Sequence, residues 1–188
     1  MKEIEEADVI AEHALENADN LKIAAKVGLA FPAIKERIIR EFISSLKGAL
    51  EERLGNSWAV EDSWSENPLA RGSYIAAFKT KWREDASIGL NCEKPGPSEL
   101  DFFIYLGKRL KTPLASELRD ALDKHYAHGQ RFGNNPWWKW VEQPYRDWNT
   151  EDALLRLWRK DEAVDYYAGQ LLRICGIAGP FLDRLCGG

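Results

Sequence analysis

The chain has 188 residues, of which 45% are hydrophobic and 30% charged, which suits one domain with a buried core and excludes compositional disorder. Its net charge of −4 is uneven: residues 1–20 hold seven acids and one lysine, which leaves 23 acids and 25 bases for the rest. The nearly neutral body lacks the strong basic bias of a dedicated nucleic-acid-binding protein.

The cysteines and the lengths of the apolar runs predict the cellular compartment of the protein. Cys92, Cys175 and Cys186 form an odd set without short spacings, so neither a disulfide framework nor a zinc motif is expected. No apolar run approaches the roughly 18–20 residues that cross a membrane, and the N-terminus lacks a signal-peptide pattern. We therefore expect a soluble cytoplasmic protein with no membrane partner and no cofactor.

Residues 3–27 are predicted to form a helix with a stripe of small apolar residues, mostly alanine, at helical spacing. Such a stripe suits close packing, either as an arm on the body or as the contact of a homodimer through the N-terminal helices. The acids of this helix form a candidate protein-binding surface; the alternatives are a solvated face or imitation of a phosphate backbone. These residues are Glu5, Asp8, Glu12, Glu16 and Asp19.

A second helix is expected to begin at Pro32, because Gly28–Phe31 interrupt the first pattern and proline is favoured in a first helical turn. Gly55 is placed to end this helix. Residues 1–55 would then form an N-terminal helical arm or hairpin, and residues 56–188 an α+β body, together one continuous domain.

Three strands are predicted in succession. Residues 74–82 alternate, with Tyr74, Ala76, Phe78, Thr80 and Trp82 on the apolar side. A second strand carries Ile88, Leu90 and Cys92, and a third runs from Leu100 to Leu106. Short polar or proline-containing links between them indicate an antiparallel meander of three to four strands packed against helices.

The most aromatic stretch is Asn134–Trp148, which holds four of the eight tryptophans. Pro136 and Pro144 argue against a long helix or a central strand there, so we expect a wedge between the sheet and the following helices. Core packing of these indoles is favoured over a ligand pocket. A helix from Pro113 precedes this stretch. Two helices follow it, one capped by Asn149 or Thr150 and a last one that Gly176, Gly179 and Pro180 loosen or end.

The motifs of several chemistries are missing. The acid-x-lysine triplet of a metal-dependent nuclease does not occur: Lys79-Thr80-Lys81 lacks the acid, and Phe103 stands where a lysine should follow Asp101. His125 and His128 could bind a metal with a nearby aspartate, but two histidines at a helix end are more often there to balance its negative dipole. We predict no catalytic residue and no metal site.

Basic and aromatic residues near two strand ends form a second candidate binding surface. They could hold a nucleic-acid backbone and stack a base, although lysines at strand edges also serve to deter aggregation. These residues are Lys79, Lys81, Trp82, Arg83, Lys108 and Arg109.

The segment from Ser73 to Leu185 resembles the C-terminal accessory region of phage and prophage proteins of PD-(D/E)XK-type nuclease families. The resemblance is carried by LDFFIYLGKRL, by PWWKWVEQPYRDW and by TEDALLRLW in that order. It implies a recognition domain of phage or mobile-element origin without the nuclease core, and it brings no catalytic residues.

The sequence thus predicts a non-catalytic binding protein with a protein partner. The expected role is inhibition or regulation of a host defence nuclease complex, such as a CRISPR or restriction system. The alternatives are a DNA- or RNA-binding accessory domain and a divergent metal-dependent nuclease.

Overall fold

The computed structural model describes residues 2–82, 85–107, 113–126, 129–132 and 135–186. The chain forms two compact units, Met1–Arg37 and Ile38–Gly188. Helix α2 (Ala18–Leu54) contributes its first half to the first unit and its second half to the other.

The first unit contains α1 (Lys2–Leu15) and the start of α2. The predicted break near Pro32 is wrong: α2 runs through Pro32, and the helices separate at Glu16 and Asn17 instead. The Asn17 Oδ1 accepts hydrogen bonds from the backbone amides of Asp19 at 3.0 Å and Asn20 at 2.9 Å. This cap satisfies two amides that a helix start leaves unpaired, whereas one proline removes a single helical hydrogen bond.

Large apolar side chains of the first unit are exposed, with Leu29 at 84%. Isolated exposed apolar residues are normal on a protein surface, whereas this set is spread over both helices of the first unit. We call this set the helical apolar surface; it comprises Val9, Ile10, Leu15, Leu21, Ile23, Val27, Leu29, Phe31 and Ile34.

The described residues of the second unit form a sheet of six strands in the order β1-β2-β3-β4-β6-β5, with every neighbouring pair antiparallel. The predicted α+β class is therefore confirmed, and the predicted meander forms the middle of the sheet. The strands are β1 (Trp58–Asp62), β2 (Tyr74–Lys79), β3 (Ala86–Lys94), β4 (Ser98–Leu106), β5 (Gln130–Phe132) and β6 (Asn135–Trp140). The strand predicted to reach residue 82 ends at Lys79, where the 3-10 helix η1 (Thr80–Trp82) begins.

Helices α3 (Pro113–Asp123), α4 (Glu151–Arg159) and α5 (Asp161–Cys186) complete the described part of this unit. Thr150 caps α4 as predicted, since its side chain accepts the amide of Ala153 at 3.2 Å. The expected end of the last helix near Pro180 is wrong, because α5 continues to Cys186. Gly179 lies buried beneath the Trp58 ring, so burial of the helix outweighs the hydrogen bond that Pro180 removes.

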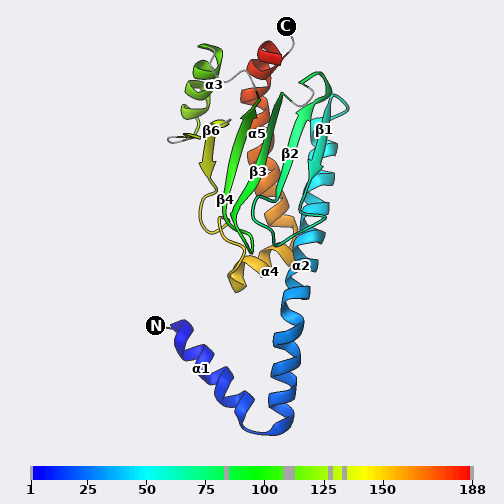
Figure 1. The fold of residues 1–188 in the computed structure, drawn as a ribbon, viewed down its shortest axis with the longest axis vertical. Helices are drawn as coiled ribbons and strands as arrows, with labels where there is room; N and C mark the ends of the chain where they lie inside the picture. Colours follow the sequence, from blue (N-terminus) through cyan, green and yellow to red (C-terminus); the bar gives the residue numbers. More distant parts are fainter. Residues whose placement is uncertain (1, 83–84, 108–112, 127–128, 133–134, 187–188) are drawn as a thin grey trace. The chain divides into compact units, whose positions relative to one another are not determined.

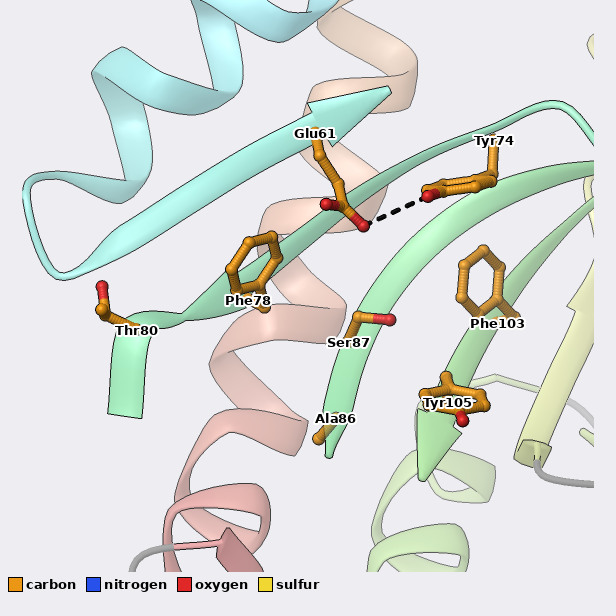
Figure 2. Close-up of a pocket in the computed structure, with 8 residues that line it drawn as sticks. All are labelled: Glu61, Tyr74, Phe78, Thr80, Ala86, Ser87, Phe103 and Tyr105. Carbon is orange, nitrogen blue, oxygen red and sulfur yellow. Dashed lines mark hydrogen bonds between the residues drawn. The ribbon is translucent and has the colours of Figure 1, made fainter. Parts of the chain in front are cut away.

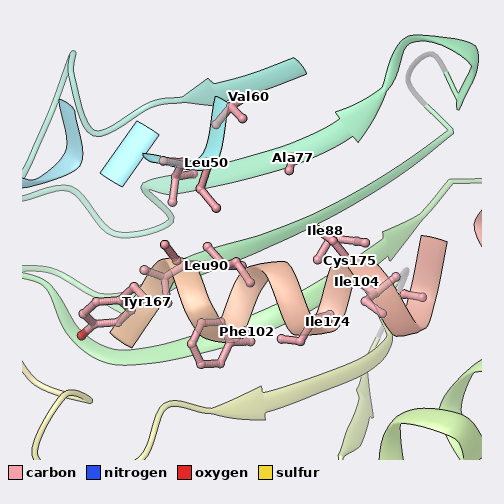
Figure 3. Packing of buried hydrophobic residues seen from close by; sticks show 14 of the residues in the cluster. Leu50, Val60, Ala77, Ile88, Leu90, Phe102, Ile104, Tyr167, Ile174 and Cys175 are labelled. Atoms are coloured by element: carbon pink, nitrogen blue, oxygen red, sulfur yellow. The ribbon is translucent and has the colours of Figure 1, made fainter. Parts of the chain in front are cut away.

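Helix α5 and the second half of α2 lie on one face of the sheet, as Figure 1 shows. Side chains that alternate along the strands point into this layer and are fully buried there. Figure 3 shows Ile88, Leu90 and Ile104 of the sheet packed against Ile174 and Cys175 of α5. The core of the unit therefore lies between the helices and one face of the sheet.

The tryptophan-rich stretch takes a different form from the predicted wedge. Residues 135–140 form β6, which lies between β4 and β5, so the expectation that no central strand occurs there is wrong. Pro136 precedes the residues of β6 that pair with β4, and it lies beside a register shift in the β5–β6 pair. A proline without an amide is tolerated at such an irregular position.

Candidate binding face of the sheet

The sheet face opposite the helices is aromatic, and no helix of the described chain covers it in Figure 1. One row across this face consists of Ala76, Gly89, Phe103 and Trp138, which stand opposite one another in the strand register. Opposite residues of an antiparallel pair project from the same side of a sheet. We call this surface the open face; its partly exposed aromatic residues are Tyr74, Phe78, Phe103, Tyr105, Trp138 and Trp140.

A hollow of about 750 Å³ lies over strands β1 to β4 on the open face. Figure 2 shows its lining side chains, with the Tyr74 hydroxyl donating a hydrogen bond to the Glu61 carboxylate at 3.3 Å. Desolvation is the main cause that raises the pKa of Tyr74, and the Glu61 charge adds to it, so the hydroxyl stays protonated. The complete lining is Glu61, Tyr74, Phe78, Thr80, Ala86, Ser87, Phe103 and Tyr105.

Gly89 allows the Phe103 ring to pack closely against the backbone of the sheet on the open face. A Cβ atom at this position would lie 2.5 Å from the Ile75 carbonyl oxygen and 2.7 Å from the Phe103 ring. The Phe103 ring therefore occupies the space that a side chain at position 89 would fill, and only glycine allows this close approach.

A second hollow of about 220 Å³ lies near the other edge of the open face, lined by Glu93, Asp101, Asn135, Trp138 and Trp140. Asp101 is only 2% exposed, and its described side-chain partner is the Asn91 amide at 3.3 Å. Burial, followed by the nearby Glu93 charge, raises the pKa of Asp101 to about 7, although the Asn91 hydrogen bond acts in the opposite direction.

The electrostatic character of the open face is acidic. Its described strand positions in β1 to β4 and β6 carry the carboxylates Glu61, Glu93 and Asp101 and no lysine or arginine. One cation beside this face is Arg146, which follows β6 in the chain and lies with its Cζ 4.2 Å from the Trp140 ring centroid. Aromatic rings among carboxylates attract cations, both through the ring quadrupoles and through the negative charges.

The tryptophans of the predicted wedge divide between the two faces of the sheet. Trp137 and Trp148 are buried in the core, as predicted. Trp138 and Trp140 instead line the second hollow, so the expectation that core packing explains the whole stretch is wrong for these two residues. The reason is strand geometry, since neighbouring residues of β6 project from opposite faces.

The candidate acidic helix lies in the first unit. Asp8, Glu12, Glu16 and Asp19 are exposed on α1 and the first turn of α2, and Glu5 also belongs to α1. Asp19 pairs with Lys22 at 3.4 Å and Glu16 with His13 at 3.0 Å, both on the surface. Whether this helix binds a partner stays a prediction.

The candidate basic residues that the structure describes converge on Asp183 of α5. Lys79 and Lys81 pair with its carboxylate at 2.8 Å and 3.0 Å, and the Trp82 Nε1 donates to it at 2.8 Å. The Trp82 ring is buried and therefore does not face solvent for base stacking. Arg83, Lys108 and Arg109 lie outside the described residues, so nucleic-acid binding by this set stays a prediction.

The open-face residues were not singled out from the sequence, although a signal for them exists. Along β4, Leu100, Phe102 and Ile104 alternate with Asp101 and Phe103, so both faces of the strand contain large apolar residues. A surface with aromatic residues on the side away from the core is the pattern that marks a binding face. The prediction for residues 74–82 placed the apolar side on Tyr74 and Phe78, because Lys79 and Lys81 alternate in phase with Ile75 and Ala77.

Other site types have no support among the described residues. Asp123, an aspartate near His125 in the sequence, accepts hydrogen bonds from the Gly129 amide at 2.9 Å and the Trp137 Nε1 at 3.1 Å. In the described ranges no three His, Cys, Asp or Glu side chains are grouped to hold a metal ion. Of the helices described, none has the length and apolar composition that crossing a bilayer requires. In comparisons with known proteins, no family model, curated protein or solved structure matches the chain.

Proposed function

We propose that this protein is a non-catalytic binding protein that holds a protein partner with basic side chains on the open face of its sheet. The observation that carries the proposal is the 750 Å³ hollow on an aromatic, helix-free face. Aromatic residues are enriched at interface cores, and tyrosine and tryptophan supply large contact areas with few rotatable bonds.

The charge of the open face favours a basic protein partner over a nucleic acid. Glu61, Glu93 and Asp101 would repel phosphates, whereas affinity for nucleic acids comes mainly from lysine and arginine contacts to the backbone. The same carboxylates attract lysine or arginine side chains of a partner. The open face therefore supports the leading prediction over its nucleic-acid alternative.

A selection with random peptides displayed on a bacterial surface tests this proposal. We expect enriched peptides to be rich in lysine, arginine and aromatic residues and to lose at least about tenfold in affinity for a Phe103→Ala variant. The matched control is Trp158→Ala, because Trp158 is 61% exposed on α4 and does not line either hollow of the open face. Selection of acidic or no peptides, or equal binding to both variants, would contradict the proposal.

The resemblance of Ser73–Leu185 to nuclease-associated phage proteins extends the proposal to a biological role. The partner would be a subunit of a host defence nuclease complex, and binding would inhibit or regulate its cleavage of DNA. DNA cleavage by purified restriction and CRISPR complexes, with and without this protein, measures the effect. If DNA cleavage is unchanged but peptides still bind the open face, the proposed inhibition is wrong and the proposed binding surface still stands.

For the first unit we propose pairing with a second copy of the chain. The helical apolar surface, with Leu29 at 84% exposure, is the kind of patch that association covers. Charge complementarity favours a second copy: residues 1–20 carry seven acids and one lysine, whereas residues 21–37 carry four bases and one acid. Two copies packed antiparallel about a two-fold axis would place each acidic segment beside a basic one.

Sedimentation velocity tests this pairing. We expect the wild-type chain to sediment as a dimer and a Leu29→Asp variant to sediment as a monomer. The control is Leu155→Asp, which introduces the same charge at an exposed apolar position of α4. A monomeric wild-type chain at every concentration would refute the pairing.

A further inference from the structure

We infer that the second hollow of the open face, between β3, β4 and β6, binds an arginine side chain of the partner. This inference rests on the proposed function, because it assigns one position of the partner to one part of the open face. The hollow holds about 220 Å³ and brings together two carboxylates, Glu93 and Asp101, and two indoles, Trp138 and Trp140.

The buried carboxylate of Asp101 lacks a cationic partner among the described residues. Asp101 is almost fully buried, yet no described cation pairs with it, and the carboxylate nearest in the hollow is Glu93. The Asn91 Nδ2 is shared between them, at 3.0 Å from Glu93 Oε1 and 3.3 Å from Asp101 Oδ2. One amide group is a poor match for two carboxylates that can each accept several hydrogen bonds. A guanidinium group would supply both the missing positive charge and the missing donors.

Trp138 and Trp140 form the aromatic part of the hollow. Their rings pack edge to face, with centroids 4.8 Å apart, and the Arg146 guanidinium already lies on Trp140. The Trp138 Nε1 is buried and has no hydrogen-bond partner in the described part of the chain. A buried indole donor without an acceptor is unfavourable, so the described part of the chain does not fully satisfy Trp138.

These features favour arginine over lysine. A guanidinium is planar, stacks on aromatic rings and presents paired donors to a carboxylate, whereas an ammonium is compact and more strongly hydrated. The indole walls of the hollow suit the stacking of a planar guanidinium, and its two carboxylates suit the paired donors. The neutral analogue citrulline keeps the planar shape and lacks the charge, so it separates stacking from charge recognition.

The test is a titration of the full chain with Nα-acetylarginine amide, followed by the NMR signals of the tryptophan indole N–H groups. We expect saturable shifts of the Trp138 and Trp140 signals, with weaker binding of the lysine analogue and much weaker binding of the citrulline analogue. Asp101→Asn should weaken arginine binding by at least about tenfold. Asp165→Asn, which removes an exposed carboxylate of α5 that lines neither hollow of the open face, should leave it unchanged.

Two further measurements apply if Asp101→Asn does not fold. Glu93→Gln changes the second carboxylate of the hollow, and arginine binding to the wild-type chain should weaken as the pH is lowered from 8 to 5. The groups that face Asp101 are Asn91 and Glu93 from β3 and the two indoles from β6, and Asp101 takes up a proton within this pH range.

The outcomes separate this inference from the proposed function. Equal shifts with arginine and citrulline, shifts confined to other indoles, or no shifts at all would overturn the arginine site. Basic peptides that still bind in a Phe103-dependent way would then leave the open face as the partner surface. If neither the amide nor the peptides bind there, both the arginine site and the proposed function fail.

Discussion

Asp183 on α5 is the acceptor for three donors from β2 and η1. Its carboxylate binds Lys79 at 2.8 Å, Lys81 at 3.0 Å and the Trp82 Nε1 at 2.8 Å. Burial alone would raise the pKa of Asp183, but these donors outweigh burial and lower the pKa to about 2. Lys79, Lys81 and Trp82, which the sequence suggested as part of a basic surface, thus connect the last helix to β2 and η1.

We predict that Asp183→Ala lowers the free energy of unfolding at pH 7 by about 1–3 kcal/mol, because it leaves the buried Trp82 Nε1 without an acceptor. Urea denaturation measures the change. Asp165→Ala on the same helix is the control, since its pair with Arg53 is exposed and should contribute roughly 0–1 kcal/mol.

The pH dependence of this effect has a defined sign. The pKa of Asp183 is lowered from 3.8 to about 2, so the carboxylate stabilises the fold above pH 3.8 and loses that effect as the pH falls towards 2. The difference between the wild-type chain and Asp183→Ala should therefore shrink over this window. A difference of the same size at pH 7 and at pH 2 would contradict the assigned role.

Asp101 predicts the opposite pH dependence. Its pKa is raised from 3.8 to about 7, so the folded chain holds a proton that the unfolded chain has lost, and stability falls as the pH rises from about 4 to 7. Asp101→Asn removes this pH-dependent loss of stability. The unfolding free energy of the variant, relative to that of the wild-type chain, should therefore rise between pH 4 and pH 8. A shift from 3.8 to about 7 corresponds to at most about 4 kcal/mol.

Thermal or urea unfolding of both chains at pH 4, 6 and 8 checks this second pH prediction. Glu61→Gln serves as the control, because Glu61 is an exposed carboxylate on the same face. If the difference in unfolding free energy between Asp101→Asn and the wild-type chain does not change with pH, burial does not raise the pKa of Asp101 in the folded chain.

Strand β3 contains a position on the open face, Gly89, where the neighbouring atoms leave no space for a side chain. Gly89→Ala would place a Cβ atom 2.5 Å from the Ile75 carbonyl oxygen, which is backbone and cannot rotate away. We predict a loss of about 1–3 kcal/mol in unfolding free energy and weaker binding of open-face peptides as Phe103 is displaced.

Gly48→Ala is the matched control for this prediction. Gly48 lies in α2, and a Cβ atom there would have open space within 4 Å. Alanine should stabilise the helix by roughly 0.5–1 kcal/mol at this position. Equal effects of the two substitutions would show that the contacts of Gly89 with Ile75 and Phe103 do not matter.

The helices and strands could be predicted where the hydrophobic periodicity was clear. Their boundaries could not be predicted correctly where the sequence contains prolines. The meander of β2, β3 and β4 follows from alternation, and the start of α4 follows from its threonine cap. Pro32, Pro136 and Pro180 each suggested an interruption that the structure does not have. Each proline removes only one backbone donor, and the packing or pairing of the surrounding element outweighs that local loss.

At the scale of the whole molecule, the sequence indicates which residues are apolar but not which apolar face the helices cover. Both faces of β2 and β4 contain large apolar side chains, so alternation alone could not assign the core. The assignment depends on α5 and the second half of α2, which bury Ile75 and Ile104 and leave Tyr74 and Phe103 on the other side. The candidate site therefore emerges only from the assembled sheet.

Hydroxyl-radical footprinting with a bound basic peptide tests the open face most directly. Peptide binding should reduce oxidation of Phe78, Phe103 and Tyr105 while oxidation of the exposed Trp158 on α4 stays unchanged. Protection confined to α4 or to the N-terminal helices, with the open-face rings oxidised as in the free protein, would contradict the account.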